Sequence, residues 1–440
     1  MNALSEALKK KRVLVCVGSG GVGKTTISAT LALRSAVDGR SSLVCTIDPA
    51  KRLANSLGLH ALGNVEAEVP ASALEPLGVK PRGRLHAMML DMKQTWDDLI
   101  LKYAPPDKRE KILSNRFYQS LSSALAGSQE YIAMEKLWEL RTKRDYELIV
   151  LDTPPTAHAL DFLEAPNRVL DFLDNEAAKW LLTPALAAGR IGLSLFSLGS
   201  SYAAKTISKF TGTETLQELA AFMMAIAPMN ESFRERARGV RELLAAEQTG
   251  FVLVTSPGRE RLDEVMHFHR LLKQNAMDVV AVVVNRVHPM PGAGLWEEMQ
   301  GLIPARRAKV EQTLRELTML AEQDARGIAE LQAAVGNTPL IQVPRFELDV
   351  HEISALWRTG RYLIGEEVIP GPTPPLPPGT RDGVRVPVPR VEPRAPSHES
   401  RHNRSTRLSS VGIREAPCIR RTYSAAAPAS TPTAVTNSGR

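Results

Sequence analysis

Short apolar runs, separated by longer amphipathic stretches, recur along the first 365 residues. Seven of these runs are largely apolar and only a few residues long, which is typical of strands buried on both faces of a parallel sheet. They are Arg12–Val17, Ser42–Ile47, Leu85–Met92, Tyr146–Leu151, Phe251–Thr255, Val279–Asn285 and Leu340–Val343. The pattern predicts an α/β fold in which helices flank a mostly parallel sheet.

The stretches between these runs have helical spacing. Thr25–Val37 follows the first run, and three longer stretches, Asp91–Lys143, Glu214–Gln248 and Leu302–Val335, also indicate helices. Residues 161–248 contain no strand signal, so we expect a helical subdomain inserted into the α/β domain at this point. The α/β domain itself is expected to span residues 1–365.

The composition changes near Ile369. Residues 371–440 hold 12 of the 30 prolines, together with eleven arginines, no lysine and four acidic residues. The net charge of this segment therefore equals the +7 of the whole chain, and the first 370 residues are neutral. A proline-rich segment with few aromatic residues buries too little apolar surface to fold. We expect residues 366–440 to be a disordered tail that can bind anionic surfaces.

Composition excludes several classes of protein. Three cysteines in 440 residues are too few for a disulfide scaffold. The most apolar region, Trp180–Ala204, is interrupted by proline, glycine and arginine, so we predict no membrane span. The N-terminus shows no targeting segment, and the expected location is the cytoplasm.

A phosphate-binding motif follows the first predicted strand. Gly18–Thr25 fits the pattern G-x-x-x-x-G-K-[ST] and leads directly into a predicted helix. In such a loop the backbone N–H groups converge on phosphate oxygens, the lysine reaches the β- and γ-phosphates, and the hydroxyl binds Mg²⁺. The motif predicts a P-loop NTPase that binds ATP and Mg²⁺. The contacting residues are Gly20, Gly21, Val22, Gly23, Lys24, Thr25 and Thr26.

Two aspartates end predicted strands beside this loop. Asp152 ends the run Tyr146–Leu151, where a carboxylate that supports Mg²⁺ belongs in this kind of site. Asp48 ends the run after the loop helix, where it either caps the next helix or orients the attacking water. Lys24, Asp48 and Asp152 are therefore the candidate catalytic residues, and Thr25 and Asp152 are the candidate metal residues.

Three segments together resemble the ArsA-type ATPases, a family of arsenite-pump ATPases and carriers of tail-anchored membrane proteins. They are Gly18–Thr26, Thr46–Ala50 and Asp152–His158. The resemblance implies that Asp48 polarises the hydrolytic water in a first switch segment. It also implies that Asp152 opens a second switch segment, which relays the γ-phosphate state to the helical subdomain. Asn285, Pro344 and Phe346 match the family's adenine-contacting elements. The alternatives are a turn residue at the end of a strand for Asn285, and loop packing for Pro344 and Phe346.

The chain departs from the family pattern at several points. Ser19 stands where the family usually has a lysine that reaches across a dimer to the partner's nucleotide. The chain has no C-x-x-C motif and no cysteine triad, so an inter-subunit zinc and a metalloid site are not expected. Cys16 and Cys45 are expected in the core. His267 and His269 are expected to face solvent.

The predicted function is that of an ArsA-type ATPase which couples switch-loop motion to a helical subdomain. That subdomain would handle a membrane-related client or pump, and the ATPase would act as a homodimer. Apolar residues in Trp180–Leu198, with Met223, Met224 and Met229, suit an apolar client segment, although an ordinary helical core is the simpler explanation. The alternative is a slow nucleotide-dependent switch or scaffold whose basic tail binds a partner.

Overall fold

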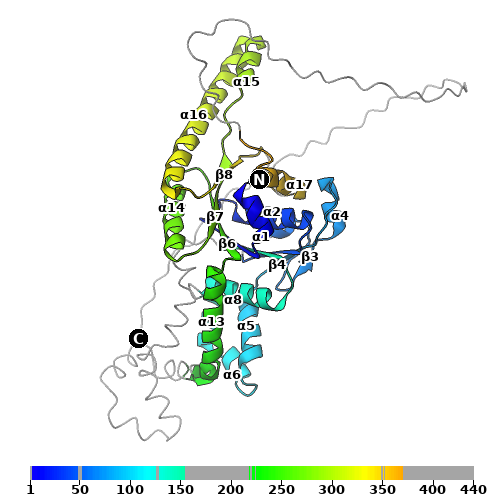
Figure 1. Ribbon diagram of the computed structural model, residues 1–440, viewed down its shortest axis with the longest axis vertical. Coiled ribbons are helices and arrows are strands. Elements are labelled where there is room, and N and C mark those ends of the chain that lie inside the picture. The colour runs from blue at the N-terminus through cyan, green and yellow to red at the C-terminus, as the bar shows by residue number, and fades with distance from the viewer. Residues whose placement is uncertain are drawn as a thin grey trace, which may run out of the picture. The chain divides into compact units, whose positions relative to one another are not determined.

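A computed structural model describes residues 2–47, 52–124, 128–153, 218, 221, 222, 224–347, 350 and 352–369. Its centre is an eight-stranded sheet in the order β3-β4-β2-β5-β1-β6-β7-β8 (Figure 1). The strands are β1 (Val13–Val17), β2 (Ser42–Thr46), β3 (Ala67–Glu68), β4 (Leu85–Met89), β5 (Leu148–Asp152), β6 (Thr249–Thr255), β7 (Val279–Val287) and β8 (Leu340–Pro344). All neighbouring pairs are parallel except β3 with β4. The prediction of a mostly parallel sheet flanked by helices is confirmed.

Both faces of the sheet are covered, as the alternation along β1 shows. Val13, Val15 and Val17 belong to one apolar core, and Leu14 and Cys16 belong to the other. The second core also receives side chains of α1 (Ala3–Lys10), α2 (Lys24–Val37) and α17 (Ile353–Leu363). The first core receives side chains of α8 (Ser128–Lys143), α13 (Asn230–Ala245), α14 (Arg259–Gln274) and α16 (Pro304–Val335). Side chains of a strand alternate between the two faces of the sheet, and both faces are covered by helices. Every position of β1 is therefore buried.

The remaining elements among the described residues are short helices. They are α3 (Arg52–Ser56), α4 (Ala71–Leu74), α5 (Met92–Tyr103), α6 (Arg109–Leu113), α7 (Arg116–Ala124) and α15 (Ala293–Glu298), with 3-10 turns at Glu75–Leu77, Ala227–Met229 and Met299–Gly301. The run Leu85–Met92, predicted as one strand, is divided between β4 and α5. Asp91 caps α5, since its carboxylate accepts a hydrogen bond of 2.9 Å from the backbone N–H of Gln94.

Helices α5, α6, α8 and α13 lie together at one end of the domain (Figure 1). A buried ion pair joins two of them, because Arg236 of α13 contacts Glu135 of α8. The Arg236 guanidinium also lies 4.2 Å from the centre of the Tyr103 ring of α5. Gly239 lets α13 approach α8 closely, since a Cβ atom at this position would lie 2.5 Å from Nε1 of Trp138 on α8.

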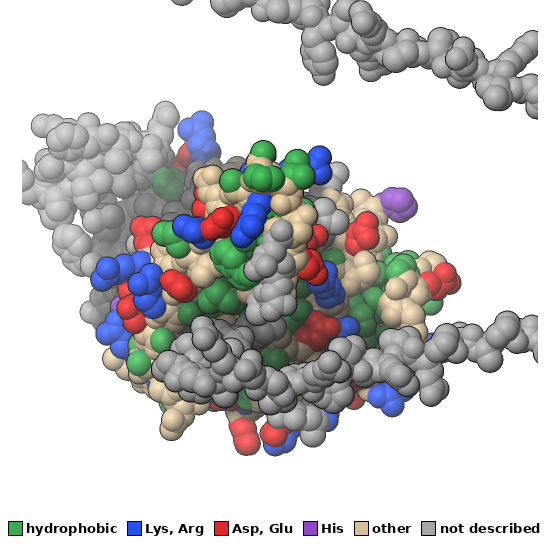
Figure 2. Space-filling model, turned by 90° about the horizontal axis from the view of Figure 1, so that it is seen from above, with side chains coloured by type: hydrophobic (Ala, Val, Ile, Leu, Met, Phe, Trp, Pro, Cys, Tyr) green, Lys and Arg blue, Asp and Glu red, His purple; other side chains and the backbone are tan. Residues whose placement is uncertain are grey.

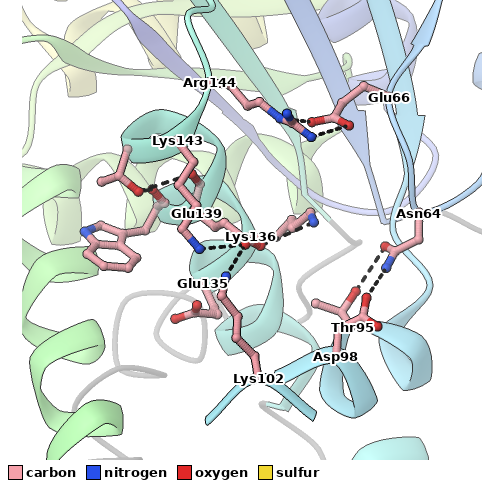
Figure 3. A network of polar contacts seen from close by, with 12 residues as sticks. Asn64, Glu66, Thr95, Asp98, Lys102, Glu135, Lys136, Glu139, Lys143 and Arg144 are labelled. Atoms are coloured by element: carbon pink, nitrogen blue, oxygen red, sulfur yellow. Dashed lines mark hydrogen bonds and ion pairs between the residues drawn. The ribbon is translucent and has the colours of Figure 1, made fainter. Parts of the chain in front are cut away.

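Polar contacts tie this helical group together and to the sheet edge (Figure 3). Glu139 of α8 accepts hydrogen bonds from Lys102 of α5 at 2.8 Å and from Lys143 at 3.0 Å. Arg144, just after α8, pairs with Glu66 at 3.0 Å. Burial raises the pKa of Glu139, but the lysine hydrogen bonds outweigh it and lower the pKa to about 2. Glu139 is therefore an ionised anchor between α5 and α8.

Several predictions fall outside the described residues. They concern Asp48, the second switch segment after Thr153, the apolar stretch Trp180–Leu198, Met223, and the tail beyond Ile369. Within the helical insertion predicted for residues 161–248, the described part from residue 218 onward is mainly helical before β6 begins. None of the helices among the described residues has the length and apolar content needed to cross a membrane.

The described surface carries charges of both signs. Figure 2 shows lysine and arginine side chains interspersed with acidic ones over the face seen from above. This mixture agrees with the neutral balance of the first 370 residues.

Candidate functional site

The loop between β1 and α2 is shaped by glycines at two positions where a side chain does not fit. A Cβ atom at Gly18 would lie 2.0 Å from the carbonyl oxygen of Val254 on β6. Gly23 has φ 97°, in the left-handed region, and a Cβ atom there would lie 2.3 Å from Nδ2 of Asn285. The neighbouring strands therefore close on the loop so tightly that only glycine is accommodated at either position.

Lys24 begins α2 and turns back into the loop. Its Nζ donates hydrogen bonds of 2.9 Å to the carbonyl oxygens of Gly18 and Ser19, and the side chain is buried. These contacts hold the ammonium group within the turn at the N-terminus of a 14-residue helix. A cation beside converging N–H groups and a helix N-terminus makes a strong anion site.

A carboxylate lies beside the first turn of α2. Asp152 ends β5, and its Oδ2 accepts hydrogen bonds from Thr25 Oγ1 at 2.6 Å and Thr46 Oγ1 at 2.7 Å. Strand register explains the arrangement, since Asp152 is paired with Cys16 of β1 on one side and Thr46 of β2 on the other. Asp152 is 1% exposed, so these donors stabilise its buried charge.

Thr25 and Asp152 form a donor set that suits Mg²⁺. A hydroxyl and a carboxylate are hard oxygen ligands, and Mg²⁺ is usually bound by one or two such groups together with phosphate oxygens. The residues that the sequence predicts for the phosphates and for the metal thus meet at the carboxyl ends of β1 and β5.

The structure joins Asn285 to the phosphate loop through the loop's backbone. Its Nδ2 donates to the carbonyl oxygen of Val22 at 2.9 Å, and the residue is 7% exposed. The next residue, Arg286, donates from Nη1 to the carbonyl oxygen of Gly21, also at 2.9 Å. Sequence reasoning did not single out Arg286, and the only signal was a basic residue directly after the predicted strand.

Pro344 and Phe346 lie at the end of β8. Pro344 is buried and pairs in register with Val287 of β7. Phe346 packs on α17, where its ring centre lies 6.0 Å from that of Tyr362 and 4.8 Å from the Arg358 guanidinium. Their assignment to adenine remains a prediction, as does that of Asn285.

The cysteines and histidines were assigned no catalytic role. Cys16 and Cys45 are buried, and burial raises the pKa of each thiol to about 12. The expectation that His269 faces solvent is wrong, whereas His267 is exposed. His269 is buried on α14, its Nε2 lies 2.8 Å from Thr338 Oγ1, and burial lowers its pKa. Among the described residues, no three His, Cys, Asp or Glu side chains gather as a metal site would require.

Comparison with known proteins agrees with this geometry. The family model described as "Anion-transporting ATPase" matches residues 11–331, well over half of the chain. ATPase GET3B of Arabidopsis thaliana is 28% identical over 294 residues, which cover 64% of this chain and 65% of that protein. ATPase GET3 of Malassezia globosa is 26% identical over 287 residues, which cover 65% and 76%.

A third relative is aligned over more of this chain. ATPase ARSA1 of Chlamydomonas reinhardtii is 26% identical over 366 residues, which cover 79% of this chain and 42% of the algal protein. The chain thus spans just under two thirds of the Arabidopsis relative and less than half of the algal one.

Proposed function

We propose that this chain, which belongs to the anion-transporting ATPase family, is an ATPase that binds and hydrolyses Mg-ATP at the loop between β1 and α2. The contact between Thr25 Oγ1 and Asp152 Oδ2, at 2.6 Å, carries the proposal. It places a hydroxyl and a carboxylate together beside a buried lysine in a glycine-shaped anion loop. The residues that would bind the phosphates, stabilise their charge and hold the metal ion thus lie within one short region.

The residues divide the work according to their chemistry. The backbone N–H groups of Gly20–Thr26 hold the phosphate chain, and Lys24 exchanges its contacts with Gly18 and Ser19 for phosphate oxygens. Thr25 and Asp152 would hold the metal ion, which when bound offsets the charge on the phosphate oxygens. Asp48 polarises the water that attacks the γ-phosphate, and Asn285 recognises adenine together with Pro344 and Phe346.

We extend the proposal to a cycle between two subunits in the cytoplasm. Two copies form a homodimer around nucleotide, and the switch segments after β2 and β5 transmit the γ-phosphate state to the helical group. The close contact of α8 with α13, through Glu135 and Arg236, gives that group a rigid base. The client is an apolar segment of a membrane protein or a membrane pump, as the family resemblance implies. The basic tail binds anionic surfaces.

A slower switch-like protein is the alternative, and Ser19 favours it. A lysine at that position would add a charge to phosphoryl transfer from the partner subunit, which can change rates by orders of magnitude. Serine supplies no such charge. Slow turnover with ATP-gated binding of a partner would support the switch.

Substitution of the loop lysine tests the central proposal. Lys24→Ala is expected to abolish ATP hydrolysis and to weaken nucleotide binding greatly, whereas Lys10→Ala, which removes an exposed lysine on α1, should change neither. Asp48→Asn is expected to retain ATP binding while hydrolysis stops. Turnover by Lys24→Ala at the unaltered rate would refute the proposed site.

Capture experiments separate the carrier from the switch. The Asp48→Asn protein, loaded with ATP, would be offered an apolar helical peptide, with and without residues 371–440. A complex that forms without the tail and dissociates in detergent supports the carrier. Binding that requires the tail and is lost at high salt supports the switch.

A further inference from the structure

The carboxyl end of β7 contains a bulge. In the pairing with β8, Val284 faces Gln342 and Val287 faces Pro344, so β7 uses one more residue than its neighbour over this interval. Arg286 lies within this bulge with φ 62°, in the left-handed region that residues other than glycine rarely adopt. Among the described non-glycine residues, only one other has a positive φ.

The bulge brings two successive side chains to the same loop. Successive residues of a regular strand point to opposite faces, but Asn285 and Arg286 both reach the phosphate loop. Asn285 donates to the carbonyl oxygen of Val22, and Arg286 to that of Gly21, each at 2.9 Å. The Asn285 side chain also accepts a hydrogen bond of 3.0 Å from the backbone N–H of Arg286, which closes the bulge. Bulges often redirect a side chain in this way beside active sites.

These contacts fix peptide planes of the loop. In a trans peptide, the carbonyl of one residue and the N–H of the next point in opposite directions. A donor on the carbonyl of Gly21 therefore sets the direction of the Val22 N–H, and Asn285 does the same for the Gly23 N–H. N–H groups of such a loop are those that bind phosphate.

We propose that Arg286 is a positioning residue for nucleotide phosphates. It orients the Gly21–Val22 peptide so that the Val22 N–H is presented to the phosphate chain, and it acts through the loop rather than by touching the nucleotide. Its exposed guanidinium also adds a positive charge beside a loop that has serine at position 19. The inference rests on the proposed nucleotide site and adds to it a residue that the motif does not contain.

Nucleotide binding by the full chain tests this role. ADP and ATP would be titrated calorimetrically into Arg286→Gly, Arg286→Ala and Arg286→Lys. The matched control is Arg345→Ala, which removes an exposed arginine after β8 that contacts His288. Loss of one hydrogen bond is expected to weaken ADP binding about 10-fold in the glycine and alanine variants. Lysine should recover part of the loss, and the control should remain within about twofold.

Thermal unfolding without nucleotide separates positioning from structural support. Glycine adopts a positive φ without strain, so Arg286→Gly should melt at the same temperature as the unaltered protein or higher, although it binds ADP more weakly. Unchanged ADP affinity in Arg286→Gly and Arg286→Ala would overturn the role. The role would also be overturned if Arg286→Gly and Arg286→Ala both melted at a lower temperature and Arg286→Lys recovered no ADP binding.

A parallel titration of Lys24→Ala keeps the two proposals distinguishable. If Lys24→Ala loses ADP binding while the Arg286 variants do not, only the positioning role fails. If Lys24→Ala binds ADP normally, the nucleotide site itself is wrong.

Discussion

Gly23→Ala is the substitution whose effect follows most directly from the structure. The new Cβ atom would lie 2.3 Å from Nδ2 of Asn285, and alanine would have to adopt φ 97°. The residue either displaces the Asn285 amide, which then loses its hydrogen bond to Val22, or changes the loop backbone. Both routes disturb the loop at its junction with α2.

Three contributions set the magnitude. A left-handed backbone destabilises alanine by about 1–2 kcal/mol. Overpacking of a tight contact typically adds about 1–3 kcal/mol, and a lost hydrogen bond adds about 1 kcal/mol. We expect Gly23→Ala to lower the free energy of unfolding by about 3–6 kcal/mol, or to weaken ADP binding by an equivalent factor if the loop rearranges instead. Urea unfolding and calorimetric titration measure the two effects.

Gly21→Ala is the matched control. Gly21 also has a left-handed backbone, with φ 75°, but a Cβ atom there meets no described atom within 4 Å. Its expected cost is therefore the backbone contribution alone, about 1–2 kcal/mol. In the Asn285→Ala background, Gly23→Ala should fall to a similar value because its clash partner is gone. A coupling energy below about 0.5 kcal/mol between the two sites would refute the contact.

Four further outcomes are expected. Glu139→Gln should destabilise the protein by about 1 kcal/mol at pH 7, a modest value because the lysine pairs are partly exposed. The pKa of Glu139 is lowered from an ordinary value of 4.5 to about 2. The stability difference between the unaltered protein and the variant should therefore disappear as the pH falls from about 4.5 to 2 in acid-unfolding curves. Gly239→Ala should lower the melting temperature despite the better helix propensity of alanine, because the Cβ atom would displace the Trp138 ring. Thr46→Val should cost about 1.5–3 kcal/mol in urea unfolding, since it removes a hydroxyl that donates to a buried carboxylate. Deletion of residues 371–440 should leave the ATPase rate unchanged while binding to anionic vesicles is lost.

The central strands could be predicted from the sequence because they are buried on both faces, whereas the two-residue edge strand β3, which is not buried, has no such signal and was not predicted. Strands buried on both faces are apolar at every position, and the runs around Val15, Val150 and Val252 reveal them directly. The phosphate loop was equally visible, since its glycines and lysine have fixed spacing. The end of β4 was not, because Asp91 lies between apolar residues and the sequence does not show that it caps a helix.

Side-chain environments were harder to predict than elements. The burial of His269 could have been inferred, since it lies on the buried stripe of α14 with Leu262, Val265 and Leu272. The contact between Arg286 and Gly21 could not, because a bulge depends on how β7 pairs with β8. Tertiary pairing decides that register, and no local pattern in the residues around Arg286 records it.

The strand order has a consequence for the synthesis of the chain. β1, which carries the phosphate loop, lies between β5 and β6, and the loop is further held by residues at the end of β7. The site can therefore close only after Val287 has been made, 270 residues after Val17, and at about 5–20 residues per second this interval takes roughly 15–55 s. Until β6 has been made, the apolar segment Val13–Val17 lacks a neighbour on at least one side, which exposes it to aggregation and to chaperones. The strand that begins the nucleotide site is thus made long before the strands that complete its surroundings.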